Sequence, residues 1–296
     1  MFTQQLFNGF VVGAVYALFA LGFNLVFGVH KIMNLAHGAI FMVGAFAGLY
    51  AVLFGLPLWL AFIVAIVVSG LLAVLLDLTA FRPLRHRGEA EFAAIVSSIG
   101  ADMILINLAL RTSGAKVMRF PFGTVPVESL TILGLRITPL QLVIAGTVAL
   151  LVVLLTAALY FTSFGRQVRA VASNERAAML LGVEPNRVYM QTFFLSGALA
   201  GVAGVLIGLA FNAIHFAMGE PYLLRGFVVL LLGGLGSLAG AVIAGLFLGV
   251  VQTLAIGYLP SGASDLILYS VLFLVLLIRP SGLFGARVAD ARVGRR

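Results

Sequence analysis

Apolar runs dominate the sequence, and each is about as long as a helix needs to be to cross a lipid bilayer. A helix of about 20 apolar residues crosses a hydrocarbon core of about 30 Å with every backbone group hydrogen-bonded internally. These runs are continuously apolar, whereas the strands of a transmembrane barrel alternate. The candidate spans are residues 6–29, 36–54, 57–80, 91–110, 139–162, 188–211 and 265–279, with a glycine-rich apolar stretch at 223–257. We therefore predict an all-α polytopic membrane protein with about 8–9 transmembrane segments, forming a single domain over residues 1–296.

The composition narrows the classes of function that such a chain can have. Hydrophobic residues make up 62% of the sequence and charged residues 9%, against roughly 45–50% and about 25% in a soluble domain. The net charge of +8 therefore indicates contact with anionic lipid headgroups and not with nucleic acid. Because the chain has no cysteine, disulfides and thiolate chemistry are excluded. The first apolar run has no basic segment or small-residue cleavage site before it, so we expect a retained span.

The basic residues predict which side of the membrane each loop occupies. If the spans cross in turn, the breaks at 30–35, 81–91 and 163–187 share one side and carry eight Lys and Arg residues. The breaks at 55–57, 111–138 and 212–222 carry four. The first side is therefore predicted to be cytoplasmic and the N-terminus to lie outside. A basic tail at 280–296 would also be cytoplasmic, which requires a broken or re-entrant helix near 223–257, at Gly233, Gly234 and Gly236.

Glycines recur four residues apart, which places each pair on one helix face. The pairs are Gly44 and Gly48, Gly197 and Gly201, Gly204 and Gly208, Gly236 and Gly240, and Gly245 and Gly249. Such faces allow helix backbones to approach closely. They are typical of ordinary helix packing and also of a moving interface that lines a pathway.

The longest interruption on the basic side, TSFGRQVRAVASNERAAMLLGVEPNRVYMQ at 162–191, has the pattern of an amphipathic helix. We expect a break near Ser173 and Asn174, a stop at Gly182, and a new element after Pro185. Two interpretations are open at this point. The helix could lie on lipid headgroups, or its apolar face could insert into a groove on a soluble partner.

Three blocks of this sequence resemble one family. They are GAVYALFALGFNLVFGVHKIMNLAHGAIFMVGAF near the start, GRQVRAVASNERAAMLLGV in the long loop, and GFVVLLLGGLGSLAGAVIAGLFLGVVQTL followed by VLLIRPSGLFG near the end. Together they are similar to the permeases of branched-chain amino acid ABC importers, the LivH type. The resemblance implies a subunit of the bacterial inner membrane that imports aliphatic amino acids, or related small solutes such as amides or urea.

The resemblance also implies partners and a docking segment. The expected partners are a second homologous permease, two cytoplasmic ATPase subunits, a periplasmic binding protein and the lipid bilayer. ATP would be used by the partner subunits, and no cofactor or metal is expected on this chain, which has no P-loop motif. The ATPase-coupling segment, within a loop at about 163–187, would include Gly165, Arg166, Arg169, Glu175, Ala178 and Gly182.

Polar residues and helix-breaking glycines within the spans are the candidates for the translocation path. They are Asn24, Asn34, His37, Asp102, Asn107, Gly233, Gly234, Gly236 and Gln252. Gln252 and Asp102 depart from the family pattern, which often has an acid at the first position and small or apolar residues at the second. Asp102 could relay a proton in a stand-alone secondary transporter or channel, or it could hydrogen-bond Ser97, Ser98 or Asn107. Asp77 and Asp102 have no His or Lys placed beside them by the sequence, so we expect no enzyme.

The stretch NLAHG at 34–38 allows two interpretations. Asn34 could act as the N-cap of the second span, with Lys31 reaching the headgroups. Alternatively, the stretch could fold back as an irregular element beside the pathway, with His37 contacting solute or a neighbouring helix.

Overall fold

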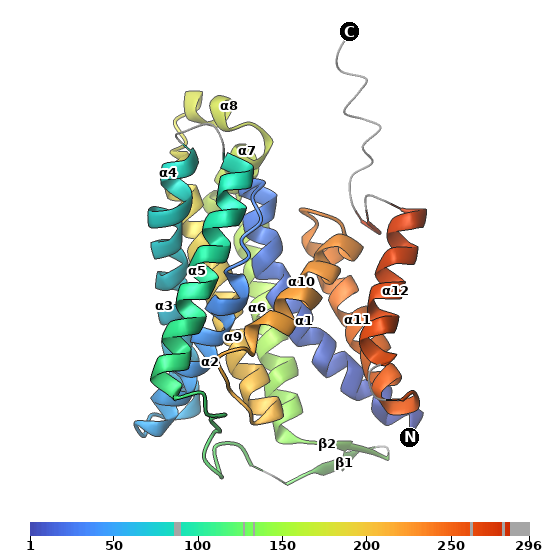
Figure 1. Cartoon of the computed structure of the whole chain (residues 1–296). Coiled ribbons are helices and arrows are strands. Elements are labelled where there is room, and N and C mark those ends of the chain that lie inside the picture. The colour runs from blue at the N-terminus through green and yellow to red at the C-terminus, as the bar shows by residue number, and fades with distance from the viewer. Residues whose placement is uncertain (86–89, 127, 133, 261–262, 280–281, 285–296) are drawn as a thin grey trace.

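The computed structural model describes residues 1–85, 90–126, 128–132, 134–260, 263–279 and 282–284, and these residues form a bundle of helices (Figure 1). In the first half, the elements are α1 (Phe2–His30), α2 (His37–Leu53), α3 (Leu58–Leu76), the π-helix η1 (Asp77–Phe81), α4 (Arg82–Arg85), α5 (Ala90–Ser113), β1 (Leu130–Ile132) and β2 (Leu135–Ile137). In the second half they are α6 (Pro139–Phe161), α7 (Ser163–Ser173), α8 (Glu175–Leu180), α9 (Pro185–Phe211), α10 (Gly219–Gly233), α11 (Leu238–Tyr258) and α12 (Ala263–Ile278).

The predicted polytopic helical fold is confirmed. Within the described residues, 6 helices are long and apolar enough to cross a membrane. They are Phe2–His30, Leu58–Arg85, Phe92–Ser113, Pro139–Phe161, Pro185–Phe211 and Leu238–Tyr258, and the shorter apolar helices are His37–Leu53 and Ser264–Ile278. With the short helix α10, these account for the number of segments predicted from the sequence.

The helices α1 and α9 form the centre of the bundle and are buried over most of their length. Helix α1 packs mainly against α11 and α9, while α2 and α3 cover other faces of α9. Most of the predicted glycine faces lie at these contacts. The pair Gly236 and Gly240 was wrong, because Gly236 precedes α11 with a φ of 83° and shares no helix face with Gly240. A Cβ added at Gly245 of α11 would lie 2.6 Å from the Cα of Ala17, and one added at Gly44 of α2 would meet the backbone of Gly201. Side chains larger than hydrogen would therefore separate these helices.

The outer helices present apolar side chains to their surroundings, as a lipid-facing surface does. Exposed examples are Ile63 and Leu71 on α3, Met103 and Ile104 on α5, and Val153 on α6. At one end of the bundle lie α4, α7 and α8; at the other lie the N-terminus and the hairpin of β1 and β2 (Figure 1). This arrangement agrees with the predicted grouping of the loops on two sides. The hairpin, whose strands pair antiparallel, was not predicted.

Two interruptions bring helix ends into the interior of the bundle. After α1, residues 31–36 form no helix, and α2 then begins at His37, whose Nε2 lies 3.2 Å from the carbonyl oxygen of Phe19. Phe19 is about 16 Å along α1 from its C-terminal end, at 1.5 Å per residue. Helix α10 begins midway along the bundle (Figure 1), and the backbone of Gly219 abuts that of Gly38.

The glycine-rich stretch is broken where the sequence predicted. Helix α10 ends at Gly233, and α11 begins at Leu238. Between them, Gly234 and Gly236 have φ values of 94° and 83°, a backbone conformation that favours glycine. The basic tail expected at 280–296 lies outside the described residues, except for 282–284.

Candidate functional site

The segment expected to couple to an ATPase forms two short helices at one end of the bundle. Helix α7 is capped by Thr162, whose hydroxyl accepts a hydrogen bond from the Gly165 backbone N–H at 3.3 Å. Asn174 interrupts the segment and caps α8 through the Ala177 N–H at 3.0 Å. Gly182 follows α8 with φ 82°, and α9 begins at Pro185. The predicted break, stop and restart are therefore observed.

The chain itself covers most of the apolar face of this segment. Val168 and Val171 of α7 are buried against the chain's own helices, and Ala178, expected at the centre of the docking surface, is 2% exposed. The exposed apolar residues instead lie at the end of α8. Met179 is 49% exposed, Leu180 89% and Leu181 82%. We call these three residues the apolar tip.

Some polar residues of this segment lie on the surface, and one is bonded to a neighbouring helix. Arg166 and Glu175 are exposed. Arg169 donates a hydrogen bond to the Leu159 carbonyl at the end of α6, and its guanidinium lies 5.8 Å from the ring of Tyr160. Arg169 therefore ties α7 to the end of α6.

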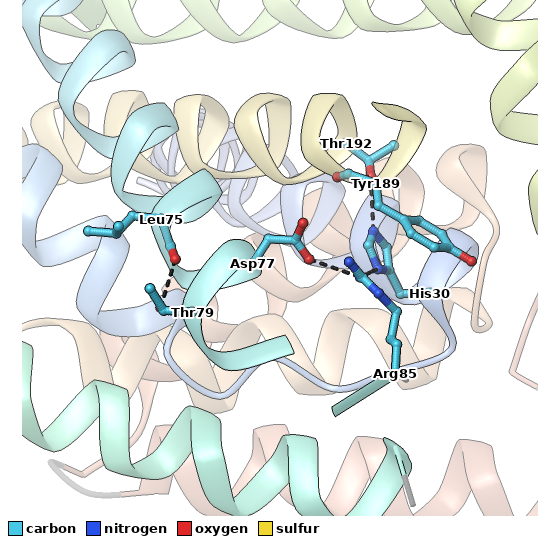
Figure 2. A network of polar contacts seen from close by, with 7 residues as sticks. All are labelled: His30, Leu75, Asp77, Thr79, Arg85, Tyr189 and Thr192. Carbon is cyan, nitrogen blue, oxygen red and sulfur yellow. Dashed lines mark hydrogen bonds and ion pairs between the residues drawn. The ribbon is translucent and has the colours of Figure 1, made fainter. Parts of the chain in front are cut away.

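Next to these helices lies a buried polar network, shown in Figure 2, that joins α1, η1, α4 and α9. Arg85 Nη1 is 2.9 Å from Asp77 Oδ1, in an ion pair whose aspartate side chain is fully buried. The same Nη1 is 3.1 Å from Nδ1 of His30, and the guanidinium lies 4.4 Å from the centre of the Tyr189 ring. We predicted no His or Lys beside Asp77, and its partner is instead Arg85, which the π-helix and α4 bring to it.

The network has a defined hydrogen-bond direction. A guanidinium can only donate, so Nδ1 of His30 accepts from Arg85 and the ring proton sits on Nε2. Nε2 then donates to Thr192 Oγ1 at 3.0 Å, and Thr192 donates to the Tyr189 carbonyl at 2.8 Å. His30 is therefore a neutral link between a cation and the start of α9.

The network also extends toward α8. Tyr189 lies one turn after Pro185, and the Glu175 carboxylate of α8 lies beside its phenol group. The Tyr189 ring packs against His30 at 4.3 Å between centroids, and Phe193 packs edge-on to His30 at 4.7 Å.

The NLAHG stretch adopts the folded-back form. Asn34 does not cap α2. Its Oδ1 accepts from the Ala36 N–H at 3.1 Å, and the helix begins with Ala36 at the N-cap position. His37 is fully buried, stacks on Phe23 at 5.5 Å and contacts Phe19 edge-on at 4.6 Å. The N-cap interpretation was wrong because the segment turns into the bundle before the helix starts.

The residues predicted to line the translocation path lie in separate parts of the structure. Asn24 bridges the break between α10 and α11: it accepts from the Gly236 N–H and donates to the Ser237 carbonyl, both at 2.8 Å. Asp102 of α5 is half-buried, and among the described residues it forms no hydrogen bond with its expected partners Ser97, Ser98 and Asn107; the last two bond to carbonyls of their own helix.

Asn107 itself is exposed on α5 and donates to the Met103 carbonyl of its own helix at 2.8 Å. It therefore contributes nothing to the interior. Gln252 of α11 is buried and accepts from the Tyr16 hydroxyl at 2.7 Å.

Sequence reasoning missed a second charged group inside the bundle. Arg225 of α10 has a side chain only 19% exposed, and it lies 3.6 Å from Asp265 at the start of α12. Its guanidinium is 5.8 Å from the ring centre of Tyr16 and 5.5 Å from that of Tyr222. An arginine within an apolar run is itself a signal of function, and this signal was present in the sequence.

Apolar outer faces, interior charged groups at broken helices and a pair of amphipathic helices at one end define this chain as a transport permease that spans the membrane several times. Residues 5–278 match the family described as "Branched-chain amino acid transport system / permease component", and the chain belongs to that family.

Individual relatives match over nearly the whole chain. It is 34% identical to the high-affinity branched-chain amino acid transport system permease protein LivH of Salmonella typhimurium, and 31% identical to BraD of Pseudomonas aeruginosa. Each alignment covers 96% of both proteins. The Escherichia coli permease protein LivM is 27% identical, with 91% of this chain and 67% of LivM covered.

One solved structure has a similar fold. PsaBC from Streptococcus pneumoniae in complex with Fab superposes with a TM-score of 0.52 and 16% identity, covering 93% of this chain and 91% of the other.

Proposed function

We propose that this chain is the membrane-spanning permease subunit of an ABC importer in the bacterial inner membrane. It moves branched-chain or other small amino acids, or related small polar solutes such as amides or urea, into the cytoplasm. The names of the relatives, branched-chain amino acid transport permeases, support the solute class. ATP is used by separate subunits, because this sequence has no phosphate-binding loop, and the chain itself binds no cofactor.

The apolar tip of α8 is the observation that carries this proposal. Leu180 and Leu181 are almost fully exposed at the end of a short helix that Asn174 caps. Exposed apolar side chains presented by a short helix suit a groove on a partner protein. We assign that partner as a cytoplasmic ATPase subunit, because the loop lies on the side with more Lys and Arg residues.

The remaining subunits are proposed from the relatives. LivH and LivM of Escherichia coli are both named as permeases of one high-affinity transport system, and both align with this chain. We therefore propose that the chain pairs with a second, homologous permease. Two ATPase subunits and a periplasmic solute-binding protein complete the importer.

The buried network could transmit a movement of the ATPase to the helices in the membrane. Movement of α8 acts through Glu175 on Tyr189, and from there on Arg85 and His30. These residues belong to α9, α4 and α1, so one displacement shifts the cytoplasmic ends of three elements together. Alternating access needs a two-state packing that ATP binding can bias, and this network provides the contact.

Replacement of Leu180 by Arg tests the docking surface. The variant places a charge in the proposed apolar contact, so we expect ATP-dependent leucine uptake to fall at least about tenfold, which corresponds to 1.4 kcal/mol. Leu180 is exposed in this chain, so membrane insertion should be unchanged. The measurement is radiolabelled leucine uptake into proteoliposomes containing the co-expressed importer, with ATP enclosed on the ATPase side.

Arg187→Gln is the matched control, because Arg187 is exposed in the first turn of α9 and, among the described residues, pairs only with Glu184 at the surface. It should keep normal uptake. Normal uptake by the Leu180→Arg variant would contradict docking through α8. Leucine uptake that needs no ATP would instead indicate a secondary transporter.

A further inference from the structure

Arg225 is held in a contact that leaves its hydrogen-bonding capacity open. Its Nη2 is 3.6 Å from Asp265 Oδ1, which is beyond hydrogen-bond distance. A well-formed pair of guanidinium and carboxylate has N–O distances of about 2.7–2.9 Å, often with two parallel bonds. The aspartate side chain is 59% exposed, against 19% for the arginine. The acid is therefore a loose counter-ion that another carboxylate could replace.

A fixed aromatic wall positions the guanidinium. The rings of Tyr16 and Tyr222 meet edge to face at 5.9 Å, and Tyr222 stacks on Phe41 of α2 at 5.0 Å. The Tyr16 hydroxyl is held by Gln252 at 2.7 Å. Because these rings come from α1, α2 and α10, Arg225 is presented from a packed surface. The hydrogen bond also gives Gln252 a positioning role.

The backbone of Arg225 lies within the bundle, and its side chain extends to Asp265 in the first turn of α12. It is six residues into α10, a helix that starts in the interior where Gly219 meets Gly38. Transporters commonly bind their solutes near the middle of the membrane, at helices that begin or break there. An ionisable group at this depth is costly unless it has a function or a partner.

We propose that Arg225 and Asp265 bind the two charged groups of a zwitterionic amino acid during its passage. The solute's carboxylate bonds to the Arg225 guanidinium and its ammonium to the Asp265 carboxylate, so the solute takes the place of the direct ion pair. The apolar side chain then packs against the aromatic wall. Arg225 and Asp265 are therefore each paired with an opposite charge both before and after the solute binds. This inference rests on the proposed function, and it selects zwitterionic amino acids over uncharged amides or urea.

Leucine uptake by the whole reconstituted importer tests this assignment. Arg225→Gln and Asp265→Asn should each lower uptake, Arg225→Gln by about tenfold or more, as expected when one member of a desolvated charge pair is removed. Arg225→Lys keeps the charge but loses the planar fork, so we expect a several-fold higher KM at unchanged assembly. Arg111→Gln, at an exposed arginine on α5, is the control and should behave as wild type.

The outcomes separate the two proposals. Normal uptake by Arg225→Gln would overturn the binding role alone. If Arg225→Gln reduces the amount of assembled importer, Arg225→Lys is decisive, and an unchanged KM per assembled complex would overturn the role. Failure of the unaltered importer to take up any amino acid would overturn the proposed function, and this inference with it.

Discussion

The strongest interaction at the scale of single residues is the buried pair of Asp77 and Arg85. Asp77 is fully buried, and its Oδ2 has no hydrogen-bond partner among the described residues. Burying both charges costs free energy that their attraction only roughly offsets, whereas leaving one of them alone is strongly unfavourable. The pair therefore contributes more to a defined arrangement of α1, α4 and α9 than to stability.

Asp77→Asn should consequently destabilise the protein more than most surface changes. It leaves the Arg85 guanidinium buried without its counter-ion, which typically costs about 3–5 kcal/mol. We expect a clear fall in the thermal unfolding midpoint in detergent, and partial recovery in the double variant Asp77→Asn with Arg85→Met. Glu184→Gln is the control: it breaks the exposed Arg187 pair, worth about 0–1 kcal/mol. Equal effects of Asp77→Asn and Glu184→Gln would contradict this view.

Local residue signals were predictable from the sequence, and distant pairings were not. Asn174 as a cap and Gly182 as a stop depend on their own neighbours in the chain. Arg225 meets Asp265 across 40 positions, and His37 meets the Phe19 carbonyl only because residues 31–36 turn inward. Such contacts are set by how helices pack, which periodicity does not specify.

At the scale of elements, the tight contact of α1 with α11 limits which substitutions the bundle can accommodate. In this contact the helix backbones themselves touch, because Gly245 and Gly249 leave no side chain between them. The four-residue spacing revealed this face, but it could not reveal that α1 is the helix that covers it. The π-helix η1 also escaped prediction, since a single extra residue per turn leaves no compositional trace.

Gly245→Ala tests this packing. The new methyl group would lie 2.6 Å from the Ala17 backbone, and forcing such groups apart costs about 1–3 kcal/mol. We expect a lower thermal unfolding midpoint. The matched change is Gly146→Ala in α6, where nothing lies within 4 Å of the added Cβ. It should be neutral or slightly stabilising, because Ala has a higher helix propensity than Gly. A stable Gly245→Ala protein would show that the helices can separate without cost.

At the scale of the whole molecule, the two ends of the bundle differ in architecture. One end carries α7, α8 and the polar network, and the other carries the hairpin of β1 and β2 (Figure 1). The count of Lys and Arg residues assigns the first end to the cytoplasm. The sequence predicts which end is cytoplasmic, but it did not predict the hairpin.

Because the chain has no cysteine, single cysteines report sidedness without background. Leu181→Cys on the apolar tip and Phe122→Cys in the loop before β1 both replace exposed side chains. In intact spheroplasts, a membrane-impermeant maleimide should label Phe122→Cys only, and Leu181→Cys should react after permeabilisation. The reverse pattern would invert the topology and remove the ATPase from α8.

The shortness of α10 has a consequence for the order in which the protein is assembled. Its 15 residues extend about 22 Å at 1.5 Å per residue, less than the hydrocarbon thickness of about 30 Å. It also carries Glu220 and Arg225, and a central arginine alone costs about 2.5–3.5 kcal/mol on insertion. Helix α10 cannot partition into lipid by itself. We therefore expect it to enter the membrane together with α11, after α1 and α2, two other helices it packs against, are in place.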